Sequence, residues 1–194
     1  HILSVACESF TVEFNAEITT EANPSDLTPE KARLLRSKGF NRLSIGVQSL
    51  DDDLLHLLGR RHSANQAHKA FTVAREAGFN NINLDLMFGL PGQTMQQWQS
   101  SIEAVLAMNP EHLSLYSLTI EPETPFASWI QTGTMEEPDP DLAADMYTWA
   151  EDRLESAEYI HYEISNWAKP RLESQHNLIY WRNSSYLGVG PGAH

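Results

Sequence analysis

Cysteine is nearly absent from this sequence, with a single one, Cys7, among 194 residues. One cysteine excludes a disulfide within the chain and any metal site built only from this chain's cysteines. Cys7 lies in a short apolar stretch, so we predict that it is buried as a small hydrophobic residue. Any cysteine-bound metal cluster therefore needs ligands from outside this sequence.

Basic residues are also scarce, because 13 Lys and Arg stand against 26 Asp and Glu, for a formal net charge of -13. A nucleic-acid surface needs a basic stripe and anionic lipid attracts basic segments, so the charge argues against both partners. No stretch approaches the ~20 apolar residues of a membrane-spanning helix, and no signal peptide is visible. We expect a soluble cytoplasmic protein with no indicated membrane contact.

Neither end of the sequence has the polar composition that usually marks a domain boundary. The sequence begins at His1 in an apolar stretch and ends inside the glycine-rich run 188–194. We therefore expect this chain to be a piece of a longer protein.

Strand and helix patterns alternate over the first two-thirds of the chain. Apolar runs predict strands, two of them buried on both faces, at 16–21, 42–48, 81–88 and 112–120. Helix caps and stop signals, including two capping boxes, predict helices at 29–38, 52–58, 64–77 and 95–108. This order is typical of a parallel sheet with helices on its face.

The predicted fold class is α/β, with residues 1–126 forming part of a parallel (β/α) barrel. A barrel is favoured over a dinucleotide-binding sheet because no G-x-G-x-x-G follows an early strand. After Phe126 the pattern changes to an acidic loop, a helix starting after Asp139, a strand at 162–167 and an irregular aromatic and glycine-rich stretch. We predict that 127–194 begins a smaller, incomplete α+β region.

Four polar residues occur where a barrel binds its ligands. Glu21 and Gln48 end the first two strands, Asp85 interrupts the third, and Arg60 follows a short helix. Ligand sites of barrels lie at the carboxyl ends of the strands, and a charged Asp within an apolar strand needs a compensating partner. Carboxylates, an amide and an arginine together suit an amino acid joined to a sugar.

Each of these residues also has an ordinary structural explanation. Asp85 fits a hydrogen-bonded core carboxylate, Glu21 and Gln48 fit strand-end hydrogen bonds, and Arg60, beside Arg61, fits a surface charge. A barrel hydrolase with Asp85 and Glu21 as acid and base is a further alternative, and it would need no metal cluster.

Three runs of sequence closely resemble the radical SAM proteins of the oxygen-independent coproporphyrinogen III oxidase-like family. They are Glu21-Ala22-Asn23-Pro24, Arg42–Ser49 and Asn83–Pro91, and the resemblance extends over essentially the whole chain. It implies a partial radical SAM barrel and S-adenosylmethionine as a ligand.

The resemblance also implies a role for each polar residue. It implies that Glu21 and Arg60 bind the methionine amino and carboxylate groups and that Gln48 and Asp85 bind the ribose. It further implies that the backbone near Thr119 lies beside the adenine. The family's [4Fe-4S] cluster is held by a C-x-x-x-C-x-x-C motif, which we expect upstream of residue 1, so this chain holds no cluster ligand. We expect this chain alone to bind S-adenosylmethionine weakly and not to cleave it.

Three later stretches resemble the heme chaperone branch of the family rather than its oxidase branch. They are residues 162–168, the H-N-x-x-Y-W pattern at 176–181, and 186–194. This resemblance implies binding of heme and its transfer to an acceptor protein.

His176 is the candidate heme ligand, and His194 is a more distant one. A neutral imidazole ligates heme iron, and Tyr180 and Trp181 offer flat apolar surfaces to a macrocycle. A histidine that only packs a loop is the structural alternative. The functional alternative is the oxidase, which decarboxylates coproporphyrinogen III to protoporphyrinogen IX.

Overall fold

The computed structural model describes residues 2–191 and contains one six-stranded sheet in the order β1-β2-β3-β4-β6-β5. The strands are β1 (Thr19–Ala22), β2 (Arg42–Gln48), β3 (Ile82–Phe88), β4 (His112–Ser117), β5 (Ile160–Glu163) and β6 (Asn166–Ala168). The first four are parallel neighbours, whereas β6 runs antiparallel to both β4 and β5. The predicted α/β class with parallel strands is confirmed, and within the described residues the sheet stays open.

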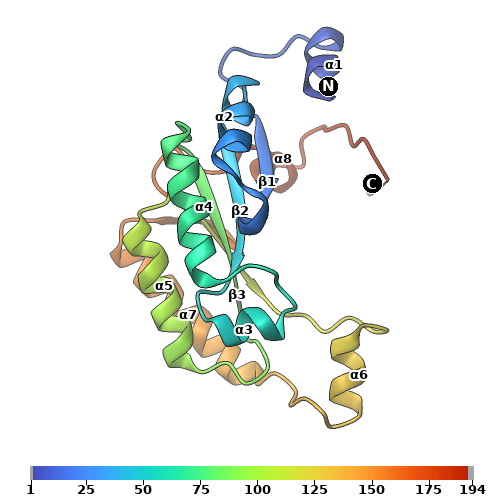
Figure 1. The fold of residues 1–194 in the computed structure, drawn as a ribbon, viewed down its shortest axis with the longest axis vertical. Helices are drawn as coiled ribbons and strands as arrows, with labels where there is room; N and C mark the ends of the chain where they lie inside the picture. Colours follow the sequence, from blue (N-terminus) through green and yellow to red (C-terminus); the bar gives the residue numbers. More distant parts are fainter. Residues whose placement is uncertain (1, 192–194) are drawn as a thin grey trace.

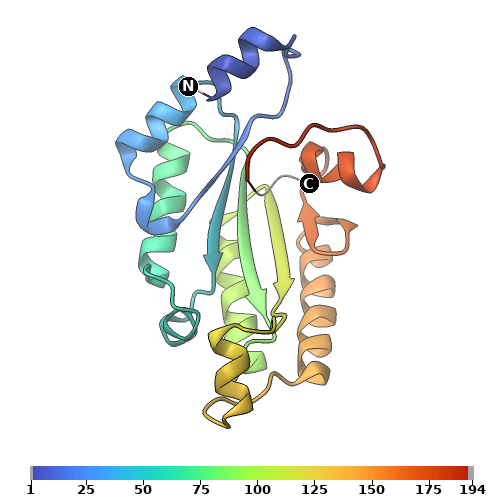
Figure 2. The ribbon, with the colours of Figure 1, turned by 90° about the vertical axis from the view of Figure 1, so that its right-hand side faces the viewer.

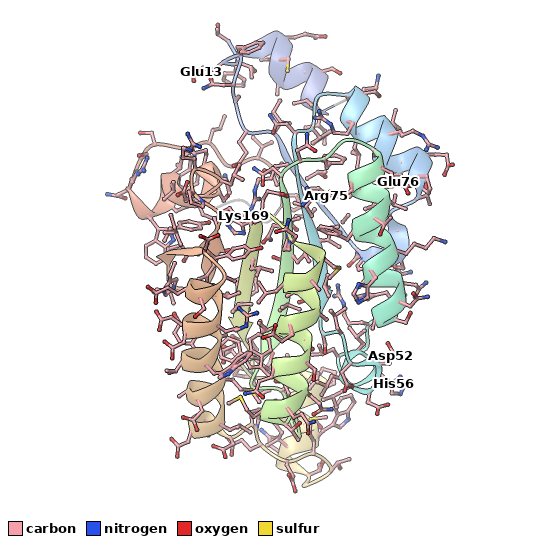
Figure 3. All side chains as sticks on the ribbon, turned by 90° about the vertical axis from the view of Figure 1, so that its left-hand side faces the viewer. Glu13, Asp52, His56, Arg75, Glu76 and Lys169 are labelled. Carbon is pink, nitrogen blue, oxygen red and sulfur yellow. The ribbon has the colours of Figure 1, made fainter. Side chains whose placement is uncertain are left out.

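Helices cover one face of this sheet, as Figure 1 and Figure 3 show for α4, α5 and α7. The helices are α1 (Ile2–Ser9), α2 (Pro29–Ser37), α3 (Asp52–Leu57), α4 (Ala64–Glu76), α5 (Met95–Met108), α6 (Pro125–Gln131), α7 (Pro140–Ser156) and α8 (Gln175–Trp181), with a short 3-10 helix at Pro24–Asp26. The capping boxes predicted at Ser63 and Thr94 are both present. Helix α8 lies on the side of the sheet opposite α4 and α5 (Figure 1; Figure 2).

The apolar core fills the space between the sheet and its helices. Alternate residues of β2 and β3, such as Ile45 and Leu84, are fully buried there. Trp98 of α5 is also fully buried, and its indole Nε1–H donates to the carbonyl of Met146 at 2.8 Å. Burial of each large apolar side chain contributes about 1.5–3 kcal/mol, so this layer supplies most of the stability of the fold.

The opposite face of the same strands is polar. Ser44 of β2, Asn83 and Asp85 of β3, and Ser114 of β4 lie in register across it. The expectation that 42–48 and 81–88 are strands buried on both faces is confirmed, but one of those faces is polar rather than apolar. That face is buried or half-buried like the other, but hydrogen bonds rather than apolar contacts satisfy it.

Several other expectations differ from the structure. The strand predicted at 162–167 is wrong as a single element, because a turn at 164–165 divides it into β5 and β6. The stretch after 168 was expected to be irregular but contains α8. Cys7 is exposed rather than buried, because no residue of α1 packs into the core.

The C-terminal strands extend the sheet of the first half, since β6 pairs with β4. Helix α7 packs beside α5 and over β3. A domain boundary near residue 126 stays a prediction. Among residues 2–191, no helix has both the length and the apolar composition that a membrane crossing requires.

Candidate functional site

Two adjoining cavities lie on the polar face of the sheet. The first, of about 320 Å³, is lined by Glu21, Gln48, Asp85 and, from α8, His176. The second, of about 440 Å³, shares the first three of these residues and adds Arg60. The structure therefore brings together five residues that are distant in the sequence: one from each of β1, β2 and β3, Arg60 from the loop after α3, and His176 from α8.

A bulge at the end of β2 sets the direction of Gln48. The pairing of β2 with β3 shifts register between Gly46 and Gln48, and Gln48 has a positive φ of 66°. Such bulges re-aim a side chain at the rim of a sheet. A Cβ atom at Gly46 would lie 3.0 Å from Gln48 Nε2 and 3.3 Å from Arg60 Nη2. Glycine at this position therefore gives both side chains room at the cavity.

Arg60 is fixed between the ends of β1 and β2. Its Nη2 donates to Asn23 Oδ1 at 2.9 Å and to the carbonyl of Gly46 at 3.3 Å. Neither partner carries a charge, so the positive charge of Arg60 is available to a ligand. The adjacent Arg61 is exposed and pairs with Asp26 at 3.3 Å. The simple surface-charge explanation thus suits Arg61 rather than Arg60.

Asp85 is held by the polar network of the sheet. Its Oδ2 accepts from Ser44 Oγ at 2.9 Å and its Oδ1 accepts from Asn83 Nδ2 at 2.7 Å. Burial raises the pKa of the Asp85 carboxyl, the hydrogen bonds oppose this, and the charge of Glu21 adds to it. Asp85 is thus both a satisfied carboxylate and part of the cavity wall.

Glu21 and Gln48 differ from Asp85 in having no internal partners. Among the described residues, no hydrogen bond or ion pair involves either side chain. Glu21 is exposed and Gln48 is half-buried. Their carboxylate and amide groups are therefore available to hydrogen-bond a ligand in the cavities.

His176 reaches the cavity from the first turn of α8. Glu17, just before β1, anchors this helix because its Oε2 accepts from the backbone N–H of Gln175 at 2.9 Å. The imidazole lies edge-on to Tyr180, with ring centroids 4.9 Å apart. Within residues 2–191 the ring nitrogens of His176 make no hydrogen bond, which leaves them available to a metal or ligand.

A buried hydrogen-bond chain that the sequence did not reveal connects Asp85 to α8. Its links are His112 Nδ1 to Asn83 Oδ1 at 2.6 Å and His112 Nε2 to the Tyr162 hydroxyl at 2.7 Å. Burial holds the pKa of His112 well below its usual value, and the charge of Arg42 adds to this. The imidazole is therefore neutral, and its Nδ1–H donates to Asn83 while Nε2 accepts from Tyr162.

The chain continues from Tyr162 to the start of α8. The Tyr162 oxygen accepts from the backbone N–H of Ser174 at 3.3 Å and from Asn177 Nδ2 at 3.4 Å. Burial raises the pKa of Tyr162 to about 12, so the hydroxyl keeps its proton. The signal for this network was present in the sequence as polar residues at alternate strand positions.

Two candidate residues lie apart from the cavities. Thr119 is exposed in the loop after β4 and lines neither of them, so its place beside an adenine stays a prediction. His194 lies outside the described residues. Over residues 2–191 no group of three or more His, Cys, Asp or Glu side chains is arranged to hold a metal ion.

Comparison with known families identifies this architecture. A family model described as the Radical SAM superfamily matches residues 4–105, which is more than half of the chain. The chain belongs to the radical SAM superfamily. Membership implies S-adenosylmethionine and a [4Fe-4S] cluster as cofactors. The single cysteine, exposed on α1, does not make the ligand set of such a cluster, so these residues do not fit that group.

Individual relatives confirm the resemblance predicted from the sequence. The heme chaperone HemW of Bacillus subtilis (strain 168) is 48% identical over 179 residues, which cover 92% of this chain and 47% of that protein. Radical S-adenosyl methionine domain-containing protein 1, mitochondrial, of Mus musculus is 42% identical over 193 residues, covering 100% of this chain and 44% of that protein. This radical SAM chain thus spans about half the length of the curated relatives it matches.

A solved structure shares the fold. Coproporphyrinogen III oxidase (HemN) from Escherichia coli superimposes with a TM-score of 0.76 at 27% identity, covering 93% of this chain and 41% of that one.

Proposed function

We propose that this chain is part of a HemW-like heme chaperone that binds S-adenosylmethionine and heme. Relatives named heme chaperone HemW, at 48% identity in Bacillus subtilis and 40% in Lactococcus lactis, support this proposal. The observation that carries it is that His176 lines the same cavity as Glu21, Gln48 and Asp85. A heme ligand and an S-adenosylmethionine site would then share one polar face.

In this proposal S-adenosylmethionine binds across the carboxyl ends of β1, β2 and β3. The unpartnered carboxylate of Glu21 receives the methionine ammonium, and Arg60 receives its carboxylate. Gln48 and Asp85 hydrogen-bond the ribose hydroxyls, and the backbone near Thr119 faces the adenine. Reductive cleavage requires a cluster as electron donor, and residues 2–191 offer no ligand set for one, so we assign no chemical step to them.

Heme is cargo in this proposal, and His176 is its axial ligand. A neutral imidazole ligates heme iron, and Tyr180 and Trp181, which are 48% and 55% exposed, present aromatic surface nearby. A heme-acceptor protein in the cytoplasm is the proposed partner. The similarity to HemN keeps the oxidase, which decarboxylates coproporphyrinogen III, as the second candidate.

A heme titration of the full protein, followed by the Soret band, tests the role of His176. We expect His176→Ala to lower heme affinity about tenfold or more, because an iron ligand is lost. His56→Ala is the matched control, since His56 is exposed on α3, on the helix-covered side (Figure 3). Equal heme affinity in the wild type and in His176→Ala would remove His176 from the site.

A second assay separates the chaperone from the oxidase. The anaerobically reconstituted protein is supplied with S-adenosylmethionine, a reductant and coproporphyrinogen III, and carbon dioxide release is measured. We expect no turnover while S-adenosylmethionine is bound. Sustained decarboxylation would instead establish the oxidase.

A further inference from the structure

Arg42, the first residue of β2, is a buried cation without a counterion. It is only 5% exposed, and its Nε is buried without a hydrogen-bond partner. None of the ion pairs among the described residues includes Arg42, and none of their hydrogen bonds involves its side chain. A buried charge that lacks a partner is strongly unfavourable, so proteins rarely keep one without a use for it.

The groups around Arg42 do not neutralise it. The positive charge of Arg42 acts on His112 and Tyr162, which are both neutral because of burial. Glu17, which lies just before β1, already accepts hydrogen bonds from Thr19, from Ser174 and from the backbone N–H of Gln175. Glu21 and Asp85 line the same cavity as Arg42, but among the described residues neither carboxylate makes an ion pair with its guanidinium.

Arg42 also lines the cavity of about 320 Å³ that His176 reaches. Ser174 and Asn177, at the start of α8, line it as well and carry hydroxyl and amide groups. An arginine beside such groups is well suited to a planar carboxylate, which accepts two parallel hydrogen bonds from the guanidinium. The cavity volume lies at the low end of ligand pockets, about 300–1,000 Å³, and so suits a side arm better than a whole macrocycle.

We propose that Arg42 forms a carboxylate-binding subsite in this cavity, beside the residues assigned to S-adenosylmethionine. The identity of its ligand rests on the proposed function: the carboxylate is a propionate of the tetrapyrrole whose iron is ligated by His176. The macrocycle is then held at two points, by a metal–nitrogen bond and by a charge-assisted hydrogen bond. An acidic side chain from the rest of the protein is the other source of a carboxylate, and the experiment separates the two.

The test compares two porphyrins with the wild type and with Arg42→Met. The first is iron deuteroporphyrin with free propionates, and the second is its dimethyl ester. We expect the wild type to prefer the free acid, and Arg42→Met to lose about tenfold or more of its affinity for the free acid only. Arg33→Met, an exposed arginine paired with Glu30 on α2, is the control and should behave as the wild type. Equal affinity of the wild type for both porphyrins overturns the subsite but leaves the heme proposal intact.

A second measurement keeps the subsite testable if neither porphyrin binds. Sodium propionate should raise the thermal unfolding midpoint of the wild type and not that of Arg42→Met, relative to sodium chloride. Without ligand, Arg42→Met should be at least as stable as the wild type, because it removes an uncompensated buried charge. A large loss of stability together with no propionate effect would show that another part of the protein supplies the carboxylate, and would overturn the proposal.

Discussion

The two faces of the sheet are made by neighbouring residues of the same strands, yet one is stabilised by apolar burial and the other by a hydrogen-bond network. In β3, Leu84 is fully buried against the helices, whereas Asn83 and Asp85 on either side of it belong to the polar network. The helix-covered face is held by apolar burial, which is non-directional and large. The polar face is held by hydrogen bonds, which contribute less stability but fix the directions of side chains. Substitutions on the two faces should therefore separate stability from binding.

The largest expected effect is on the helix-covered face. Leu84→Ala should lower the free energy of unfolding by about 2–5 kcal/mol, because it leaves a cavity in a close-packed layer. Denaturant unfolding followed by circular dichroism measures this difference. Leu34→Ala, on the exposed side of α2, is the control and should change stability by less than about 0.5 kcal/mol. A similar small change for Leu84→Ala would contradict the assignment of this face as the core.

For Asp85, the residue after Leu84 in β3, the same comparison predicts a large effect on binding and a small effect on stability. Asp85→Asn should lower S-adenosylmethionine affinity about tenfold or more, since it removes a charged acceptor from the proposed ribose site. Its effect on stability should be much smaller than that of Leu84→Ala, because the buried charge of Asp85 is itself unfavourable. Calorimetric titration of the reconstituted protein measures the affinity.

Asp53→Asn provides the matched control for this binding experiment, because Asp53 is exposed on α3 and lines neither cavity. It should bind S-adenosylmethionine as the wild type does. Unchanged affinity in Asp85→Asn would reduce Asp85 to a structural carboxylate of the network.

The pH dependence of stability should also originate on the polar face. The pKa of His112 is well below its usual value of 6.5 in the folded state, so the unfolded chain binds its proton more readily. The contribution of His112 to stability is therefore present above pH 6.5 and is lost as the pH falls below it, by up to about 1.4 kcal/mol per pH unit. Urea unfolding between pH 5 and 8 measures this slope. His112→Gln should flatten it, and an identical slope in that variant would contradict the neutral buried imidazole.

The sequence predicted the helix-covered face better than the polar one, for physical reasons. The bounds of β2 and the capping boxes at Ser63 and Thr94 could be predicted, because each depends only on residues close together in the sequence. Strand ends also pointed to the cavity, since parallel strands converge at their carboxyl ends. The sequence of each of these elements is therefore sufficient to predict it.

Helix α8 and the hairpin of β5 and β6 could not be predicted in the same way. A seven-residue helix is unstable alone, and Glu17, which anchors α8, lies 158 residues from Gln175. The exposure of Cys7 and the unpaired state of Arg42 likewise depend on tertiary arrangement, which no local pattern encodes.

The smallest expected effect tests whether the polar face reaches α8 through Tyr162. Tyr162→Phe removes the hydroxyl that links His112 to Ser174 and Asn177, and should lower stability by about 1 kcal/mol. Hydrogen exchange at the first amides of α8 should accelerate, because the helix start then keeps only its contacts with Glu17 and the Ser174 cap. The matched control is Tyr147→Phe, which removes a hydroxyl that donates to the carbonyl of Ile164 at 2.8 Å and should leave α8 unchanged. If both variants exchange alike at α8, the buried chain does not position His176, and the two faces of the sheet act more independently than the hydrogen bonds indicate.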